Sequence, residues 1–414
     1  MSEETKKKGI SAQPSVTIAD VYDAARCLQG VTTKTKLIVS PFFSDVSGNE
    51  VYLKPENLQK TGSFKLRGAY NKISHLSKEE RAKGVITASA GNHAQGVAFA
   101  AQKLGIKAII CMPATTPILK VEATRAYGAE VVLHGDTFDD AFQKSQDLQA
   151  EHGYVYVHPF DDPLVLLGQG TTALEIIDEL KDVDAILVPV GGGGFASGVA
   201  FATKAVNPRV QVIGVEPTGA ACMENSFKRG TVSTLGAIDT VADGCAVKTP
   251  GELTYSFCKE YLDELITVSE MEIMSALLFL IEKHKLIAEG AGVLALAALN
   301  HLPFKNKKVV SILSGGNIDI STISALIDKA MIARGRVFCF AVQLPDKPGQ
   351  LLMVADILAQ ENANVIRLEH NQAMVTDSFK TVQLEVTVET HGAEHISKIT
   401  CALEKAGLSV TKIY

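Results

Sequence analysis

The sequence predicts an α/β protein with two open, mostly parallel-sheet subdomains and a separate C-terminal domain of order βαββαβ. Between residues 51 and 330, short β-branched runs alternate with longer helical patterns, which is typical of parallel strands joined by crossover helices. These runs are apolar at nearly every position, so we expect burial on both sheet faces. Near residue 332 the pattern changes, and the elements beyond it have the order of a ferredoxin-like module.

These patterns predict the following elements in chain order. Strands of the first region are expected at 51–54, 84–89, 107–113, 130–135, 184–190, 210–216 and 308–316. Helices of that region are expected at 93–105, 117–128, 195–206 and 286–299. In the C-terminal region we expect strands at 336–344, 364–372, 379–390 and 408–414, and helices at 350–363 and 394–407. Ligands of open α/β sheets bind beyond the carboxyl ends of the strands, so we expect functional residues there.

The composition is that of an ordinary globular protein: of 414 residues, 46% are hydrophobic and 21% are charged. A formal net charge of -6 provides no positive field for nucleic acid or anionic membranes, so neither is expected as a partner. The 7 cysteines include no Cys-x-x-Cys pair, which favours reduced thiols in a cytoplasmic protein. The polar N-terminus predicts no secretory signal, and no apolar run reaches the roughly 18 residues of a membrane span.

The segment TGSFKLRGAYNKI, residues 61–73, places Lys65 between a turn-prone Thr-Gly-Ser and a helical pattern. The positive end of a helix and the neighbouring Arg67 both lower the pKa of an ammonium group, which frees an amine for Schiff-base chemistry. Taken alone, a lysine at a helix start is more commonly a surface residue.

Two strand-to-helix turns offer backbone N–H groups to an anion. In residues 89–92, Ser-Ala-Gly-Asn suits a carboxylate or phosphate, although a simple helix cap explains it equally well. In residues 191–194, four consecutive glycines are costly in backbone entropy and indicate a phosphate site. That run, followed by a strand ending in Glu216, also resembles a dinucleotide-binding fingerprint with Ala196 as its relaxed last position, which would predict an NAD-dependent oxidoreductase.

Two more residues have distinctive chemistry. The strand at 308–316 runs into Ser314, whose hydroxyl can hydrogen-bond a ring nitrogen while staying neutral, although an ordinary Ser-Gly-Gly turn has the same letters. Glu289 is an acid in the otherwise apolar pattern of 286–299, and a buried acid must be paired, ligated or protonated.

Five segments occur in a fixed order: GSFKLRGA, SAGNHAQG, the tetraglycine run, AEGAG and SGGN. In this order they resemble the pyridoxal-phosphate enzymes of the tryptophan-synthase β-subunit type, and within them the threonine/serine dehydratases. The resemblance covers about residues 20–330. It implies a catalytic domain over residues 1–332, with a small subdomain at about 56–160 inserted in a larger one. It also implies dehydration and deamination of L-threonine or L-serine to 2-oxobutanoate or pyruvate, with release of ammonia.

The resemblance assigns a role to each candidate residue. Lys65 would hold pyridoxal 5′-phosphate as a Schiff base and would remove the substrate α-proton. The other cofactor-binding residues would be Phe64, Asn92, Gly191, Gly192, Gly193, Gly194 and Ser314. The substrate carboxylate would lie against Ser63, Ser89, Ala90 and Gly91.

Two positions depart from the related serine racemases. Those enzymes carry a second serine where this chain has Ala90, so we expect elimination with little racemisation, and racemase-like activity is the alternative. They also hold a divalent cation with a glutamate, a backbone carbonyl and an aspartate. Glu216 and Ala220 match the first two, but Cys222 replaces the aspartate, and a hard cation prefers oxygen, so a divalent or monovalent cation here is doubtful.

The segment LPDKPGQLLMVADILAQENANV, residues 344–365, resembles an ACT domain, the amino-acid-sensing module of many metabolic enzymes. The domain would span residues 336–414. Such domains commonly pair edge to edge, with ligands at the interface. The resemblance therefore implies an amino-acid effector and a homo-oligomer, either a dimer or a tetramer.

Overall fold

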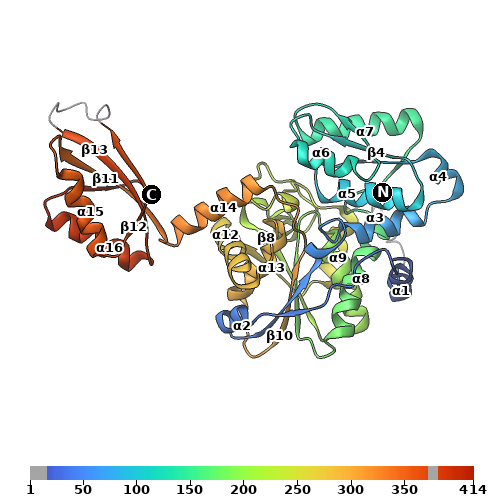
Figure 1. Cartoon of the computed structure of the whole chain (residues 1–414). Helices are drawn as coiled ribbons and strands as arrows, with labels where there is room; N and C mark the ends of the chain where they lie inside the picture. The colour runs from blue at the N-terminus through green and yellow to red at the C-terminus, as the bar shows by residue number, and fades with distance from the viewer. Residues whose placement is uncertain (1–15, 372–380) are drawn as a thin grey trace, which may run out of the picture. The chain divides into compact units, whose positions relative to one another are not determined.

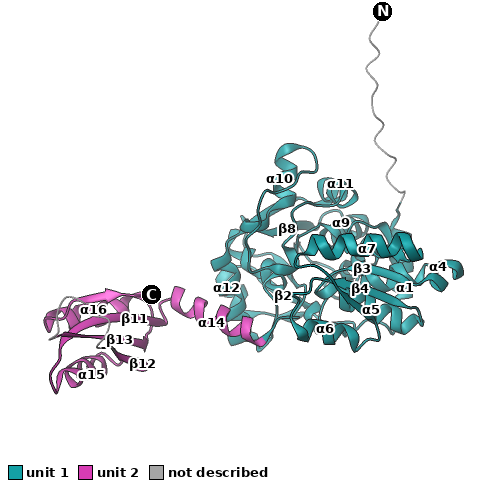
Figure 2. Cartoon of the chain, turned by 90° about the horizontal axis from the view of Figure 1, so that it is seen from above, with its two compact units in different colours: residues 1–319 teal, residues 320–414 magenta. Residues whose placement is uncertain are grey.

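The computed structural model describes residues 16–371 and 381–414. The contacts divide the chain into two compact units, Met1–Asp319 and Ile320–Tyr414, which Figure 2 colours separately. The fold class predicted from the sequence is confirmed: two mostly parallel sheets lie in the first unit and an antiparallel ferredoxin-like sheet lies in the second. The predicted strand ends at residue 372 and at residues 379–380 lie outside the described residues.

The larger sheet of the first unit has six strands in the order β1-β2-β10-β7-β8-β9. The strands are β1 (Ile38–Val39), β2 (Glu50–Pro55), β7 (Ala185–Pro189), β8 (Gln211–Pro217), β9 (Glu264–Val268) and β10 (Lys308–Leu313). All neighbouring pairs are parallel except β1 with β2, an antiparallel edge that the sequence pattern did not predict. Every residue of β7 is buried, as a strand covered on both faces requires.

The smaller sheet of the first unit has four parallel strands in the order β5-β4-β3-β6. They are β3 (Val85–Ala88), β4 (Ala108–Met112), β5 (Glu130–Leu133) and β6 (Val155–Tyr156). Two apolar clusters cover the two faces of this sheet, one under α5 (Asn92–Leu104) and one under α7 (Phe138–His152). The smaller sheet with its helices forms a separate lobe of the first unit (Figure 1).

Helices of the first unit pack mainly against one another and against the sheets. The remaining α-helices are α1 (Ile18–Cys27), α2 (Pro41–Ser47), α3 (Lys65–Ser74), α4 (Lys78–Lys83), α6 (Ile118–Arg125), α8 (Pro163–Glu179), α9 (Gly194–Val206), α10 (Cys222–Arg229), α11 (Glu252–Tyr261), α12 (Glu270–Phe279) and α13 (Leu294–Ala297). Short 3-10 or π segments are η1 (Glu56–Leu58), η2 (Thr218–Ala220), η3 (Asp243–Cys245), η4 (Leu280–His284), η5 (Ala291–Val293) and η6 (Ala298–His301).

Helix α3 lies where the two lobes of the first unit meet. It packs against α5 of the smaller lobe and against α8 of the larger one. Glycines permit this approach: a Cβ on Gly68 would lie 2.7 Å from the Val165 carbonyl oxygen of α8, and one on Gly96 would lie 3.2 Å from the α3 backbone. The first residue of α3, Lys65, is therefore held at the junction of the lobes.

The predicted helix at 286–299 is wrong in its first part. Residues 286–290 are not helical, and the rest divides into η5, α13 and η6. The reason is a close backbone contact: the Glu289 N–H donates to the Gly315 carbonyl at 3.1 Å, and a Cβ on Gly292 would lie 2.2 Å from that oxygen. A regular helix through Glu289 would not keep this contact.

The second unit has the predicted βαββαβ order after its first helix, α14 (Ile320–Ala333). Its elements are β11 (Val337–Pro345), α15 (Gln350–Gln360), β12 (Asn364–Asn371), β13 (Thr381–Glu389), α16 (Ala393–Lys405) and β14 (Val410–Lys412). The sheet order is β12-β13-β11-β14 with antiparallel pairing throughout. Phe338, Phe340 and Leu384 lie in its apolar core.

Across the described parts of both units, every helix is too short or too polar to cross a membrane.

Candidate active site

A cavity of about 860 Å³ opens beyond the carboxyl ends of β3, β6, β7 and β10. Most of the residues singled out from the sequence line it: Phe64, Lys65, Ser89, Ala90, Gly91, Asn92, Gly191, Gly192, Gly193, Gly194, Glu289 and Ser314. Ser63 does not line the cavity itself, but it precedes Phe64, which does, and its backbone pairs with that of Gly315. The cavity is thus in the position that parallel α/β sheets favour for ligands.

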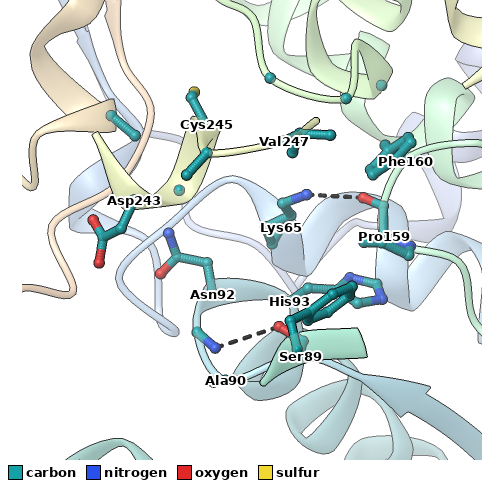
Figure 3. A pocket seen from close by; sticks show the side chains of 18 of the residues that line it. Lys65, Ser89, Ala90, Asn92, His93, Pro159, Phe160, Asp243, Cys245 and Val247 are labelled. Carbon is teal, nitrogen blue, oxygen red and sulfur yellow. Dashed lines mark hydrogen bonds between the residues drawn. The ribbon is translucent and has the colours of Figure 1, made fainter. Parts of the chain in front are cut away.

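Lys65 is the first residue of α3, and its side chain is directed into the cavity (Figure 3). Its Nζ donates a hydrogen bond to the Pro159 carbonyl at 2.8 Å, and it lies 5.3 Å from the centre of the Phe64 ring. Burial lowers the pKa of Lys65 to about 8, because the charged form loses hydration. The residue can therefore supply an uncharged amine near neutral pH, which an ordinary surface lysine cannot.

Phe64, just before α3, stacks on Phe195 of α9, with ring centres 3.8 Å apart and an interplanar angle of 11°. Both rings line the cavity. The pair fixes the start of α3 against the start of α9 and gives the cavity a flat aromatic wall.

Asn92 begins α5 directly after the loop that leaves β3, and its amide is held from two sides. Its Nδ2 donates to Glu289 Oε1 at 2.5 Å, and its Oδ1 accepts from Asn317 Nδ2 at 2.7 Å. In the loop before it, the Gly91 N–H donates to Ser89 Oγ at 3.3 Å. Lys65 and Asn92 therefore reach the same cavity from the starts of two helices, α3 and α5 (Figure 3).

The tetraglycine run connects β7 to α9, and each of its positions is too crowded for a side chain. A Cβ would lie 2.9 Å from Cys245 Cα at Gly191 and 2.4 Å from the Phe160 ring at Gly192. At Gly193, where φ is 92°, it would lie 2.6 Å from the Met223 side chain, and at Gly194 it would lie 2.8 Å from the Phe160 backbone. The run lines the cavity at the N-terminus of a 13-residue helix and so forms a cradle suited to a phosphate.

Two serines offer hydroxyl groups at or near the cavity. Ser314 follows β10, is 3% exposed and donates its hydroxyl hydrogen to the Ala291 carbonyl at 3.2 Å. The Ser63 hydroxyl is completely buried and has no hydrogen-bond partner among the described residues. A buried hydroxyl without a partner costs free energy, so a ligand or water at Ser63 would relieve it.

Glu216 and Ala220 do not line this cavity. Both carboxylate oxygens of Glu216 are occupied, because they accept the Met223 and Glu224 backbone N–H groups at 2.8 Å at the start of α10. Burial raises the pKa of Glu216 to about 8, so a neutral carboxyl is favoured. Glu216 therefore caps the start of α10 and is not directed into the cavity, where a bound dinucleotide would need it.

The sequence interpretation missed an aromatic wall formed by the smaller lobe and the segment after β6. Its members line the same cavity: Phe138, Phe142, Tyr156, His158 and Phe160. His158 Nδ1 accepts the Asp161 N–H at 2.7 Å, which leaves the hydrogen of a neutral ring on Nε2. A possible signal was the polar segment HPFDDP at 158–163 directly after an apolar strand, but β6 has only 2 residues and was not recognised.

Comparisons with known proteins place most of this chain beside enzymes of one family. The family model described as "Pyridoxal-phosphate dependent enzyme" matches residues 28–315. The chain is 47% identical over 396 residues to a Thermotoga maritima protein named L-threonine ammonia-lyase, covering 95% of this chain and 99% of that protein. It is 46% identical over 315 residues to the Escherichia coli K12 protein named L-threonine dehydratase catabolic TdcB, covering 75% of this chain and 96% of that protein.

Solved structures give the same result. The processed form of threonine deaminase isoform 2 from Solanum lycopersicum matches with a TM-score of 0.72 and 40% identity, over 79% of this chain and 99% of that chain. Serine racemase from Dictyostelium discoideum matches with a TM-score of 0.70 and 37% identity, over 74% of this chain and 100% of that chain.

Proposed function

This chain belongs to the pyridoxal-phosphate dependent enzyme family, and from that premise we propose that it is a threonine ammonia-lyase. It converts L-threonine to 2-oxobutanoate and ammonia, and L-serine to pyruvate and ammonia. The observation that carries this assignment is the 47% identity to an L-threonine ammonia-lyase over 95% of the chain, because that match includes both compact units.

The residues of the cavity fit pyridoxal phosphate. The tetraglycine cradle lines the cavity at the start of α9 and suits the phosphate, and the amine of Lys65 suits the aldehyde. Phe64 would lie against the ring, Asn92 would donate an N–H to the ring oxygen, and Ser314 would face the ring nitrogen. When bound, the cofactor supplies an electrophilic aldehyde and a ring that takes up the electron pair left by the departing α-proton.

The side chains of this protein then perform three tasks. Lys65, uncharged in a large fraction near pH 8, accepts the α-proton at Nζ. The Ser63 hydroxyl and the loop of Ser89, Ala90 and Gly91 bind the substrate carboxylate. The Ser314 hydroxyl would place no negative charge beside the ring nitrogen, which would favour prompt loss of the β-hydroxyl.

Ala90 separates this proposal from a serine racemase. Its methyl group lines the cavity at the position where racemases carry a second serine, so it has no proton to give to the opposite face of the α-carbon. We therefore propose elimination with little production of D-serine. The oxidoreductase alternative is not supported, because Glu216 caps α10 and does not line the cavity.

We further propose that residues 336–414 form an ACT-like domain that binds an amino-acid effector and pairs with a second copy. Three apolar side chains of the edge strand β12 are exposed, Val365 at 40%, Ile366 at 53% and Leu368 at 38%. An exposed apolar edge strand is a template for pairing with another chain. Gly349, with φ 94°, forms the tight turn into α15 that the resemblance to ACT domains requires.

The proposal is tested with purified holoenzyme. We expect 2-oxobutanoate from L-threonine, pyruvate from L-serine and no rapid accumulation of D-serine, measured by coupled reduction of the oxo acid and by chiral chromatography. Borohydride reduction followed by peptide mass spectrometry should find the cofactor on Lys65, and Lys65→Ala should lose both the label and turnover. A label on another lysine, or oxo-acid formation at wild-type rate by Lys65→Ala, would refute the proposal.

A further inference from the structure

Glu289 is a buried acid in the wall of the cavity that the proposed reaction does not use. Its residue is 5% exposed, and its backbone N–H is fixed to the Gly315 carbonyl at 3.1 Å. It lies in the irregular segment before η5, where the sequence predicted a helix. A buried carboxyl is costly to keep, so its role requires an explanation.

The carboxyl of Glu289 has one short hydrogen bond, from Asn92 Nδ2 to Oε1 at 2.5 Å. On the other side of the same amide, Asn317 Nδ2 donates to Asn92 Oδ1 at 2.7 Å. A carboxylate oxygen only accepts and an amide nitrogen only donates. If the Asn92 amide turned by 180° beside an ionised Glu289, oxygen would face oxygen and nitrogen would face nitrogen, so the two neighbours together then allow only one orientation.

The backbone around Glu289 is built to admit this contact. A Cβ on Gly315 would lie 2.4 Å from Glu289 Oε1 and 3.1 Å from Asn92 Nδ2. A Cβ on Gly244 would lie 3.5 Å from the same carboxylate oxygen. Glycine at position 315 is therefore needed for the carboxyl and the amide to meet.

The charges around Glu289 place its ionisation near neutral pH. Burial, reinforced by the charge of Asp243, raises the pKa of Glu289 to about 7, whereas the hydrogen bond from Asn92 and the charges of Lys120 and Lys65 act in the opposite direction. Lys120 itself lies 3.5 Å from Asp243. A carboxylate forms a stronger hydrogen bond with an N–H than a neutral carboxyl does, so the restraint on Asn92 strengthens as pH rises.

We infer that Glu289 is a positioning residue that fixes the side-chain amide of Asn92, so that one of its N–H groups is presented to the ligand in the cavity. The amide nitrogen carries two hydrogens, and Glu289 holds one of them. Because the amide is planar, holding one N–H also fixes the direction of the other N–H. This inference rests on the proposed function, since the ligand is the ring oxygen of pyridoxal phosphate.

A double-mutant cycle on cofactor affinity tests this role. The apoenzyme of each variant is titrated with pyridoxal phosphate, and the dissociation constant is read from absorbance and protein fluorescence. Loss of one restraining hydrogen bond should raise the dissociation constant of Glu289→Ala about three- to tenfold. If Glu289 acts through Asn92, the double variant Asn92→Ala/Glu289→Ala should bind no more weakly than Asn92→Ala alone. Multiplicative losses, or unchanged affinity in Glu289→Ala, would overturn the inference.

Glu289→Gln is the conservative variant and keeps the test valid if the alanine variant folds poorly. Its amide oxygen can still accept from Asn92, so the cofactor dissociation constant at pH 6 should stay within about twofold of wild type. The wild type should gain affinity relative to Glu289→Gln as pH rises from 6 to 8. A ratio of the two constants that is flat across this range would contradict the role of the carboxyl.

Asp243→Asn is the matched control, because it removes a neighbouring charge without touching Asn92. The cofactor affinity of Asp243→Asn should remain within about twofold of wild type. A loss of affinity equal to that of Glu289→Ala would show that the charge of the cavity, and not the contact with Asn92, determines cofactor binding. The proposed function is tested separately by threonine turnover in the wild type. Failure of one test is thereby distinguishable from failure of the other.

Discussion

The ring of Phe160 occupies the space that any side chain at Gly192 would need, since a Cβ there would lie 2.4 Å from Phe160 Cδ1. The ring is itself held in place, 4.7 Å from the His158 ring in an edge-to-face arrangement. Because of this residue after β6, the loop after β7 needs glycine at position 192. The shape of the cradle is a property of two distant parts of the chain.

Gly192→Ala should therefore damage the cradle. We expect cofactor affinity to fall at least about tenfold, and the free energy of unfolding to fall by about 1–3 kcal/mol, because overpacking forces neighbours to shift. Titration of the apoenzyme and urea denaturation measure the two effects. Gly236→Ala is the control, since nothing lies within 4 Å of its Cβ position. Equal affinities in the two variants would show that the cradle does not hold the cofactor.

Arg67 lies two residues after Lys65 and ties α3 to the larger lobe through a buried ion-pair network. Its guanidinium donates to Glu56 at 2.8 Å and to Glu175 at 2.7 Å, with the Arg67 side chain 1% exposed. Although burial opposes ionisation, the Arg67 guanidinium holds the pKa of Glu56 below its usual range. Arg67→Ala should lower the free energy of unfolding by about 3–5 kcal/mol, since a buried carboxylate loses its partner.

Lys34→Ala provides the comparison for Arg67, measured by the same urea denaturation. Lys34 pairs with Asp178 on the surface, where the two side chains are 63% and 67% exposed. Removing such an exposed pair should cost about 1 kcal/mol or less. If Arg67→Ala were no more destabilising than Lys34→Ala, the buried network would not anchor α3.

The pH dependence of the free energy of unfolding should show that His93 stays neutral in the folded protein. The residue is 3% exposed, and its Nε2–H donates to the Val157 carbonyl at 2.9 Å. Burial, followed by the charge of Lys65, lowers the pKa of His93 from 6.5 to about 3. The unfolded chain therefore takes up a proton near pH 6.5, whereas the folded chain does not, so this contribution is complete above pH 6.5 and is lost as pH falls toward 3.

Urea denaturation at pH 7.5 and 5.5 tests His93 by comparison with His93→Gln, whose amide can still donate to Val157. Between these pH values the wild type should lose about 1.4 kcal/mol more than the variant. Glu216 and Glu289 also titrate, but they are present in both proteins and cancel in the difference. The same pH dependence in both proteins would mean that His93 is not held neutral.

The parts of the site that could be predicted from the sequence are those with a characteristic local composition. Lys65, Asn92 and the tetraglycine run each lie at a strand end or a helix start with a characteristic composition, and the structure brings all of them to one cavity. The open α/β architecture could also be predicted from the sequence, because buried parallel strands are apolar throughout.

What the sequence did not predict depends on contacts between distant segments. The conformation at Glu289 is imposed by the Gly315 backbone, which overrides a helical pattern. Phe160 belongs to the cavity because it packs on Gly192, a contact that no periodicity encodes. The edge strand β1 has only 2 residues, too few to produce a recognisable pattern.

Removal of residues 336–414 should separate regulation from catalysis. The E. coli relative named L-threonine dehydratase matches this chain over only 315 residues, and that match covers 96% of the relative's own length. A protein of nearly that size therefore carries this name without a second unit of this kind. We expect the truncated protein to keep threonine turnover within about threefold of the full chain. Inhibition or activation by an amino-acid effector should disappear, because an effector acts only through a site whose affinity differs between two states. Steady-state kinetics of both proteins with isoleucine, valine and other amino acids would measure this, and an effector response that survives the truncation would place the regulatory site in the catalytic part.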